Sequence, residues 1–180
     1  MGQYYKPIFL GEKEDGKPET IKAFFYSHDY DNGLKLMEHS WMRNDFVATI
    51  ESQLSEGAPF HKSRLVWAGD YADKEENSEK NLYHVCEDSL KMKPRTSKKM
   101  YRYILNHTKM EFIDKRKIPK SSDGWQVHPL PLLTSEGCGM GGGDFHGESN
   151  SIGIWARDSI SVQNKKPIGF TEITCPDFKE

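Results

Sequence analysis

The sequence has few cysteines and no long apolar run. Its three cysteines, Cys86, Cys138 and Cys175, are scattered, odd in number and without a CxxC pair. That usage is typical of reduced thiols rather than of a disulfide framework. The N-terminal residues lack the apolar core of a signal peptide, and no apolar stretch approaches the length of a membrane span. We therefore expect a soluble cytoplasmic protein with no membrane partner.

The sequence also lacks an excess of basic charge and the common signatures of catalysis. The formal net charge is −2 over 180 residues, which argues against nucleic acid as a partner, because nucleic-acid coats depend on a strongly basic surface. No Gly-x-Gly-x-x-Gly opens a helix, no phosphate loop carries Lys-Ser/Thr, and no His-x-x-x-His pair is present. These absences leave the cofactor unknown and catalysis open.

What the sequence does contain predicts a folded α+β protein. Aromatic residues make up 12% of a chain whose length suits a single domain covering residues 1–180. Apolar residues at steps of three and four predict a kinked helix or two short helices over residues 34–54, capped by Asn44 or Asp45. The remaining patterns favour an antiparallel, hairpin-rich sheet with one or two helices packed on one face.

Strand and turn patterns give the expected order of the sheet. Residues 3–10 and 21–26 read as a hairpin, with Pro7 favouring an edge position for the first strand. Residues 100–105 and 109–114 read as a second hairpin around Asn106-His107-Thr108. Residues 63–68, 152–162 and 168–174 are further strand candidates, residues 81–92 favour a helix, and two prolines make residues 124–133 extended.

A glycine-rich stretch, residues 137–147, is the best site candidate in the sequence. Neither a helix nor an ordinary strand tolerates this glycine density, so it is a loop with uncovered backbone N–H groups. Such a backbone can form an anion-binding nest, or it can be a tight connection between strands or a flexible linker. The predicted ligand-binding residues here are Gly139, Gly141, Gly142, Gly143, Asp144 and His146.

Four tryptophans raise the question of an aromatic wall beside that loop. Trp67 and Trp155 are candidates to stack on a flat ligand, and the alternative for each is a place in the core. Asp144 and His146 also have the right chemistry for a divalent metal, although polar loop residues are the commoner meaning of such clusters. No metal site is therefore assigned.

Two further features have a functional and an ordinary interpretation. Cys138 or Ser135 is a possible nucleophile with His128 or His146 as base, but no third orienting group is identifiable. Lys91, Lys93, Arg95, Lys98 and Lys99 form a basic run around Pro94. Such a run can meet phosphates or an acidic partner, and it more often forms a solvated loop.

Several motifs together resemble a family of small proteins found in bacteria and their phages. They are Gly-Gln-Tyr-Tyr-Lys after Met1, Trp-Ala-Gly-Asp-Tyr-Ala-Asp at residues 67–73, Gly-Gly-Gly-Asp at residues 141–144, and residues 33–41 and 128–134. The resemblance transfers no functional residue. It implies a prophage or mobile-element accessory protein in the host cytoplasm, a context in which counter-defence roles are common.

The sequence therefore predicts a protein that binds an anionic ligand. We expect a phosphorylated small molecule or nucleotide at the glycine-rich loop. A metal-assisted hydrolase of such a ligand, using Asp144 and His146, is one alternative. The other is an inhibitor that acts on a host protein through its surface.

Overall fold

The computed structural model describes residues 3–137 and 151–174. Its strands and α-helices are β1 (Tyr5–Leu10), β2 (Ile21–Phe25), α1 (Asp45–Gln53), β3 (Arg64–Gly69), α2 (Leu82–Val85), β4 (Lys91–Met92), β5 (Tyr103–Asn106), β6 (Glu111–Asp114), α3 (Pro129–Thr134), β7 (Ser135–Glu136), β8 (Asp158–Gln163) and β9 (Thr171–Glu172). Single 3-10 turns occur at Ser27–Tyr30, Leu36–Glu38, Cys86–Asp88 and Lys115–Lys117.

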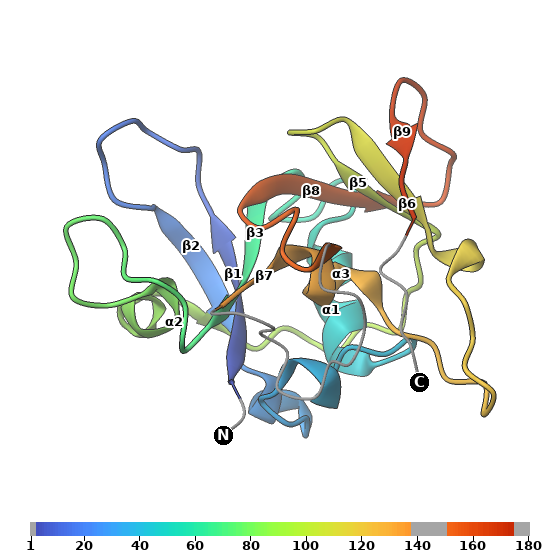
Figure 1. The fold of residues 1–180 in the computed structure, drawn as a ribbon, viewed down its shortest axis with the longest axis horizontal. Coiled ribbons are helices and arrows are strands. Elements are labelled where there is room, and N and C mark those ends of the chain that lie inside the picture. The colour runs from blue at the N-terminus through green and yellow to red at the C-terminus, as the bar shows by residue number, and fades with distance from the viewer. Residues whose placement is uncertain (1–2, 138–150, 175–180) are drawn as a thin grey trace.

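The strands form a mixed sheet in the order β4-β2-β1-β3-β8-β5-β6-β9, with β7 paired to β3. The long pairs are antiparallel, whereas the short strands β4, β7 and β9 each pair in parallel with a neighbour. β8 pairs with β3 at one end and with β5 along most of its length, so it joins the two halves of the sheet (Figure 1). The predicted α+β class is confirmed.

Both predicted hairpins are present, but β1 is not an edge strand. It pairs antiparallel with β2 on one side and with β3 on the other. The reason lies in the register: the pairing with β2 begins at Ile8, so Pro7 precedes that ladder and breaks none of its hydrogen bonds. A buried proline is therefore compatible with a central strand here.

The predicted helical region is divided between the turn Leu36–Glu38 and α1. Asn44 caps α1, because its side-chain oxygen accepts a hydrogen bond from the Val47 backbone N–H at 3.1 Å. Phe46 and Ile50 of α1 then pack in the main core beside Trp67 of β3. The capping residue and the buried face of this helix are as the sequence predicts.

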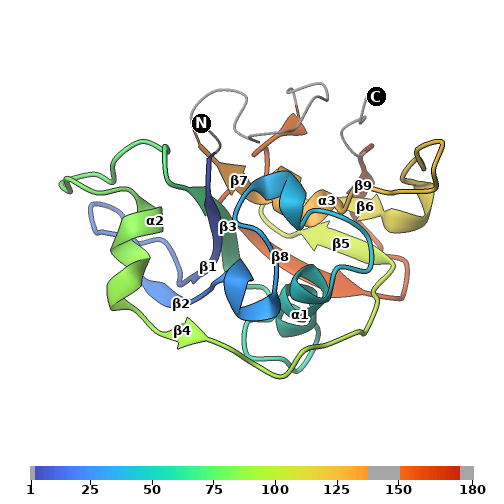
Figure 2. The ribbon, with the colours of Figure 1, turned by 90° about the horizontal axis from the view of Figure 1, so that it is seen from below.

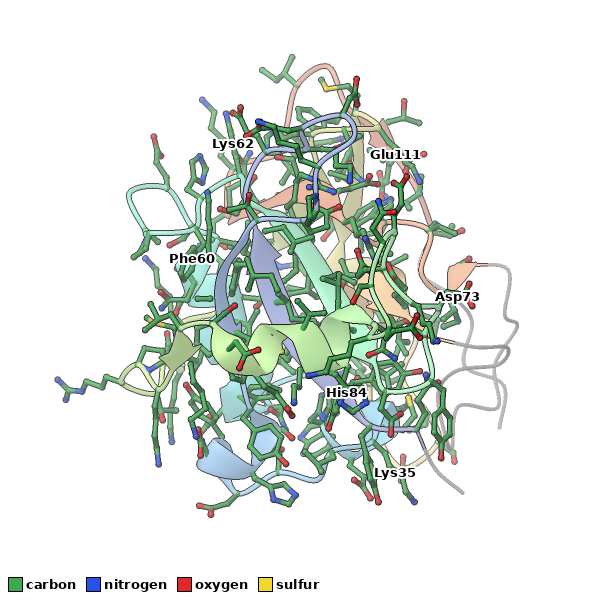
Figure 3. The ribbon with its side chains drawn as sticks, turned by 90° about the vertical axis from the view of Figure 1, so that its left-hand side faces the viewer. Lys35, Phe60, Lys62, Asp73, His84 and Glu111 are labelled. Atoms are coloured by element: carbon green, nitrogen blue, oxygen red, sulfur yellow. The ribbon has the colours of Figure 1, made fainter. Side chains whose placement is uncertain are left out.

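The short helix α2 covers the opposite face of the strands β1, β2 and β3. Figure 3 shows it lying across these strands, and Figure 2 places it on the other side of them from α1. Leu82 and Cys86 join a second core with Ile8 and Val66. The buried ammonium of Lys6 lies 3.9 Å from the centre of the Tyr83 ring, which adds a cation–π contact between β1 and α2.

The sequence predicts an extended conformation for residues 124–133. The structure differs, because the second half of this stretch forms α3. Pro129 occupies the first turn of α3, where a missing N–H breaks no helical hydrogen bond. His128 caps the helix by accepting from the Leu130 N–H at 3.2 Å. Prolines that exclude a central strand are compatible with a helix start.

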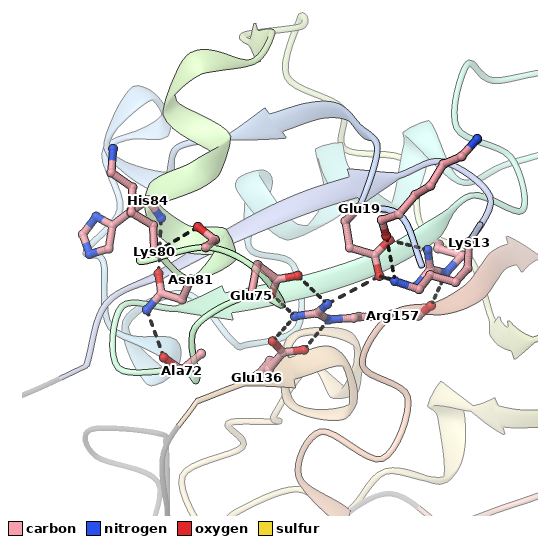
Figure 4. Close-up of polar contacts among 12 residues, drawn as sticks. Lys13, Glu19, Ala72, Glu75, Lys80, Asn81, His84, Glu136 and Arg157 are labelled. Atoms are coloured by element: carbon pink, nitrogen blue, oxygen red, sulfur yellow. Dashed lines mark hydrogen bonds and ion pairs between the residues drawn. The ribbon is translucent and has the colours of Figure 1, made fainter. Parts of the chain in front are cut away.

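Arg157 joins two loops and strand β7 through a carboxylate cluster (Figure 4). Its guanidinium makes two hydrogen bonds each to Glu136 and Glu75 and a longer one, at 3.4 Å, to Glu19. Burial alone would lower the pKa of Arg157, but its hydrogen bonds to Glu136 and Glu75 raise it above its ordinary value. Arg64 also pairs with Glu19, at 2.7 Å, so Arg64 and Arg157 share the negative charge of the Glu19 carboxylate.

In the parts of the chain that the structure covers, no helix has the length and apolar character needed to cross a bilayer. The longest described helix, α1, has nine residues, and a span of the hydrocarbon core needs about 20.

Candidate functional site

Most of the predicted site falls outside the described residues. Gly139, Gly141, Gly142, Gly143, Asp144 and His146 all lie in the segment 138–150, so their assignment to a ligand stays a prediction. Gly137, the first glycine of the stretch, is described. A Cβ there would come 2.4 Å from the side-chain amide nitrogen of Gln3, so any larger residue at this position would have to displace the Gln3 side chain.

Trp67 and Trp155 both lie in the main core and are 0% exposed. Trp67 donates its indole N–H to Nε2 of His39 at 2.9 Å, and Trp155 donates to a carboxylate oxygen of Glu111 at 2.8 Å. Both tryptophans thus have a place in the core, which the sequence leaves open as the alternative to stacking on a ligand. Neither ring presents a face to solvent for a ligand.

His39 is a buried neutral imidazole that should make stability depend on pH. Burial lowers its pKa from 6.5 to about 4. The unfolded chain therefore takes up a proton first as the pH falls, so stability is complete above pH 6.5 and declines toward pH 4. Between pH 7 and pH 5 we expect a loss of about 2 kcal/mol from His39.

Urea unfolding at pH 7 and pH 5 tests this contribution in the wild type and in His39→Gln. We expect the variant to be less stable at pH 7, because the imidazole no longer packs against the Phe46 ring at 5.3 Å, but to lose less stability on acidification. An equal loss between the two pH values in both proteins would contradict the prediction. His107, whose pKa burial also lowers to about 4, remains in both proteins and sets the residual slope.

The described residues do not bring together a catalytic or metal constellation. Among them, no group of three or more His, Cys, Asp and Glu side chains is placed to hold a metal ion. Ser135 donates its hydroxyl to the Leu132 carbonyl oxygen. Cys86 is a free buried thiol whose pKa burial raises to about 12, so it is a poor nucleophile at neutral pH.

Two adjoining pockets of about 370 and 270 Å³ form what we call the basic groove. They share Met42, Lys120 and Gln126. The remaining lining residues are Arg43, Met100, Tyr101, Arg102, Lys115, Arg116, Gly124, Trp125 and Asn164. The groove thus combines cations, aromatic and thioether side chains, and two side-chain amides.

The backbone around the groove is fixed by hydrogen bonds between its segments. The Met42 N–H donates to the Gln126 carbonyl at 2.9 Å, and Trp41 forms a β-bridge with Val127. The Arg102 N–H donates to the Asn164 side-chain oxygen at 2.9 Å. The groove therefore lies between segments that are tied to one another.

The cations of the groove fall into two groups. Arg102 is held by a two-pronged pair with Asp114, at 2.7 and 3.0 Å, and this contact lowers the pKa of Asp114. Arg43, Arg116 and Lys120 are exposed and have no carboxylate within ion-pair distance among the described residues. Three positive charges thus remain free to meet an anion.

Beneath the groove lies a buried charge cluster of Glu51, Lys115 and His128. Lys115 Nζ is 2.6 Å and His128 Nε2 is 3.3 Å from the same Glu51 oxygen. Burial opposes ionisation of Glu51, yet Lys115 and His128 hold its pKa below the ordinary value. Burial, with a smaller contribution from Lys115, lowers the pKa of His128, so the imidazole is neutral and the cluster adds no net charge.

Sequence reasoning missed this groove, although one signal was present. The segment 115–120 holds four cations in six residues, Lys115, Arg116, Lys117 and Lys120. The basic run over residues 91–99 reaches the groove only through its neighbours Met100 and Tyr101. Within that run, Lys91 and Lys98 pair with acidic residues of the same chain, Asp29 and Asp45.

Comparison with known proteins adds no family to this geometry. No family model matches the chain, and neither the curated proteins nor the solved structures give a match. Function is therefore argued from the groove itself, from its charge and from its lining side chains.

Proposed function

We propose that the protein binds a phosphorylated small molecule of the nucleotide class in the basic groove. The observation that carries the proposal is the meeting, in one groove, of the half-buried Trp125 with three cations that have no carboxylate partner within residues 3–137 and 151–174. Arginine and lysine bind phosphate oxygens, and an aromatic ring face stacks on a base. The sequence predicts the same ligand class, and the groove supports a different location for it.

The charge of the groove limits the ligand further. Asp114 and Glu51 neutralise Arg102 and Lys115, which leaves about three positive charges on Arg43, Arg116 and Lys120. A nucleoside di- or triphosphate has a similar number of negative charges near neutral pH. Met42 and Met100 supply apolar surface for the organic part of such a ligand.

Nucleotide binding would suit an accessory protein of a prophage or mobile element. A small protein that sequesters a nucleotide removes a signal or substrate from a host enzyme, which would be a counter-defence role in a phage or mobile element. The alternative of a metal-assisted hydrolase rests on Asp144 and His146, which lie outside the described residues. Turnover of the nucleotide on addition of Mg²⁺ or Mn²⁺ would favour that alternative.

Neutralising the free cations should weaken nucleotide binding strongly. In Arg116→Gln/Lys120→Gln we expect affinity for ATP to fall by about tenfold per residue, because each side chain loses a charge-assisted hydrogen bond. Titration of intrinsic fluorescence measures the affinity, since Trp125 lines the groove whereas Trp67 and Trp155 are buried. Trp125→Phe should remove most of the signal change.

A matched control changes the same charge elsewhere. Lys17 and Lys74 are exposed and line neither pocket, so Lys17→Gln/Lys74→Gln should bind ATP like the wild type. If both double variants weaken binding equally, the effect is long-range charge and the groove is not the site. Failure of the wild type to bind any of ATP, ADP, GTP or AMP at millimolar concentration contradicts the proposed function.

A further inference from the structure

A second basic pocket, separate from the groove, lies where the two halves of the sheet meet. Its volume is about 450 Å³, and its walls come from the β1–β2 loop, residues 61–64, the β5–β6 turn and the start of β8. Figure 3 shows Lys62 beside the β1–β2 loop at this end of the molecule. None of its lining residues is shared with the basic groove.

Cations of this pocket come from three separate segments. Lys22 is the second residue of β2, Lys62 precedes β3 and Arg64 is its first residue, and Lys13 lies in the β1–β2 loop. Lys13 and Arg64 share the carboxylate of Glu19. Within the described ranges, Lys22 and Lys62 have no acidic partner, so the pocket has an uncompensated positive charge.

Lys62 has φ = 57°, a left-handed backbone that glycine adopts without strain, so Lys62→Gly removes the charge without adding strain. His107, which precedes the lining residue Thr108, has its pKa lowered to about 4 by burial first and then by the neighbouring Lys62 and His61. The positive charge of Lys62 thus acts on this side of the pocket.

The remaining walls are polar and small. The hydroxyl oxygens of Ser63 and Thr108 accept hydrogen bonds from Lys22 Nζ and from the Ser159 N–H, which leaves their own hydrogens available to donate. Leu10 is the one apolar side chain among the described lining residues, and the imidazole of His61 is the one aromatic ring. Nδ1 of that ring lies 3.1 Å from the Leu54 carbonyl oxygen. With no Trp, Tyr or Phe in its walls, the pocket suits a compact charged oxyanion better than a base.

We propose that this pocket binds a compact inorganic oxyanion of the pyrophosphate class, independently of the nucleotide groove. Lys22, Lys62 and Arg64 contact the oxyanion, and the hydroxyls of Ser63 and Thr108 donate to it. Glu12, an exposed carboxylate on the rim, repels the same ligand and limits its affinity.

Calorimetric titration with pyrophosphate at low salt tests the pocket. We make every variant in the Arg116→Gln/Lys120→Gln background, so that the groove does not contribute. Lys62→Gly should weaken binding about tenfold while leaving thermal stability unchanged or higher, because glycine relieves the left-handed backbone. Glu12→Gln should strengthen binding several-fold, a gain that a purely structural role would not produce.

Lys166→Gln is the matched control, because Lys166 is exposed beyond the far end of β8 and outside the pocket. Wild-type behaviour of Lys62→Gly and Glu12→Gln, or the absence of pyrophosphate binding in the background variant, would overturn the proposal. Titration with AMP in place of pyrophosphate distinguishes an organic phosphate ligand from an inorganic one. If AMP binds as tightly and responds equally to Lys62→Gly, the ligand is an organic phosphate and the inorganic assignment is wrong.

Discussion

Replacing Arg157 by alanine is expected to lower the free energy of unfolding by about 3 kcal/mol. The change leaves Glu75 and Glu136 close together without their cation, whereas Glu19 loses only its longer contact and keeps Arg64. The Glu75 and Glu136 side chains are 16% and 26% exposed, so water replaces the lost partner only in part. The Arg157 side chain is 24% exposed, and we therefore take the low end of the range for breaking a buried pair.

Two matched variants separate the charge from the backbone. Arg157 has φ = 65°, so Arg157→Ala retains the left-handed strain while Arg157→Gly removes it. The glycine variant should be more stable than the alanine variant by about 1 kcal/mol. Arg157→Lys retains the charge but loses the two-pronged contacts, and its stability should lie between those of Arg157→Ala and the wild type.

Urea unfolding at pH 7 measures all three variants. A loss of less than about 1 kcal/mol in Arg157→Ala would show that the cluster behaves like an exposed ion pair. High salt is the second readout: screening should reduce the repulsion among the carboxylates and narrow the gap between Arg157→Ala and the wild type.

Elements with local signals were predictable from the sequence. The β1–β2 hairpin, the β5–β6 hairpin and the Asn44 cap of α1 follow from turn residues and apolar spacing within ten or so positions. The start of β8 was not predictable from the sequence. A strand is expected over residues 152–162, but residues 152–157 form turns and the strand begins only after Arg157. At that point the Arg157 side chain contacts Glu19, Glu75 and Glu136, which are all distant from it in the sequence.

The basic groove shows why the candidate site was harder to predict from the sequence than the fold. Its walls come from residues 42–43, 100–102, 115–126 and 164, and no motif joins these segments in the sequence. Cations with and without a carboxylate partner also look alike in the sequence. Arg102 pairs with Asp114 and Arg116 does not, and only the folded structure shows this difference. Local density of Lys and Arg over 115–120 was the one usable signal.

Breaking the buried pair of Glu51 and Lys115 should produce the largest loss of stability of any single change considered. Both side chains are at most 5% exposed, and their atoms lie 2.6 Å apart. Glu51→Gln or Lys115→Met leaves one buried charge without its partner, for which we expect a loss of about 3–5 kcal/mol at pH 7. Glu51→Leu/Lys115→Met removes both charges and should be more stable than either single variant.

The two single variants should respond to pH in opposite directions. In Lys115→Met the uncompensated charge is negative, and one proton taken up by Glu51 or His128 removes it, so the deficit relative to wild type shrinks as the pH falls toward 5. In Glu51→Gln the uncompensated charge is the positive Lys115, which must lose a proton, so the deficit shrinks as the pH rises toward 9.

Unfolding free energies of the wild type and the three variants at pH 5, 7 and 9 test this pair. Each deficit is taken against the wild type at the same pH, because the histidines make the wild type itself less stable in acid. Deficits that do not change with pH would mean that lost packing, and not an unpaired charge, causes the loss. A double variant less stable than both single variants would show that the ion pair is itself stabilising at this position. Opposite pH trends would instead show that Glu51 and Lys115 are both charged in the folded protein, in keeping with the 2.6 Å contact between them.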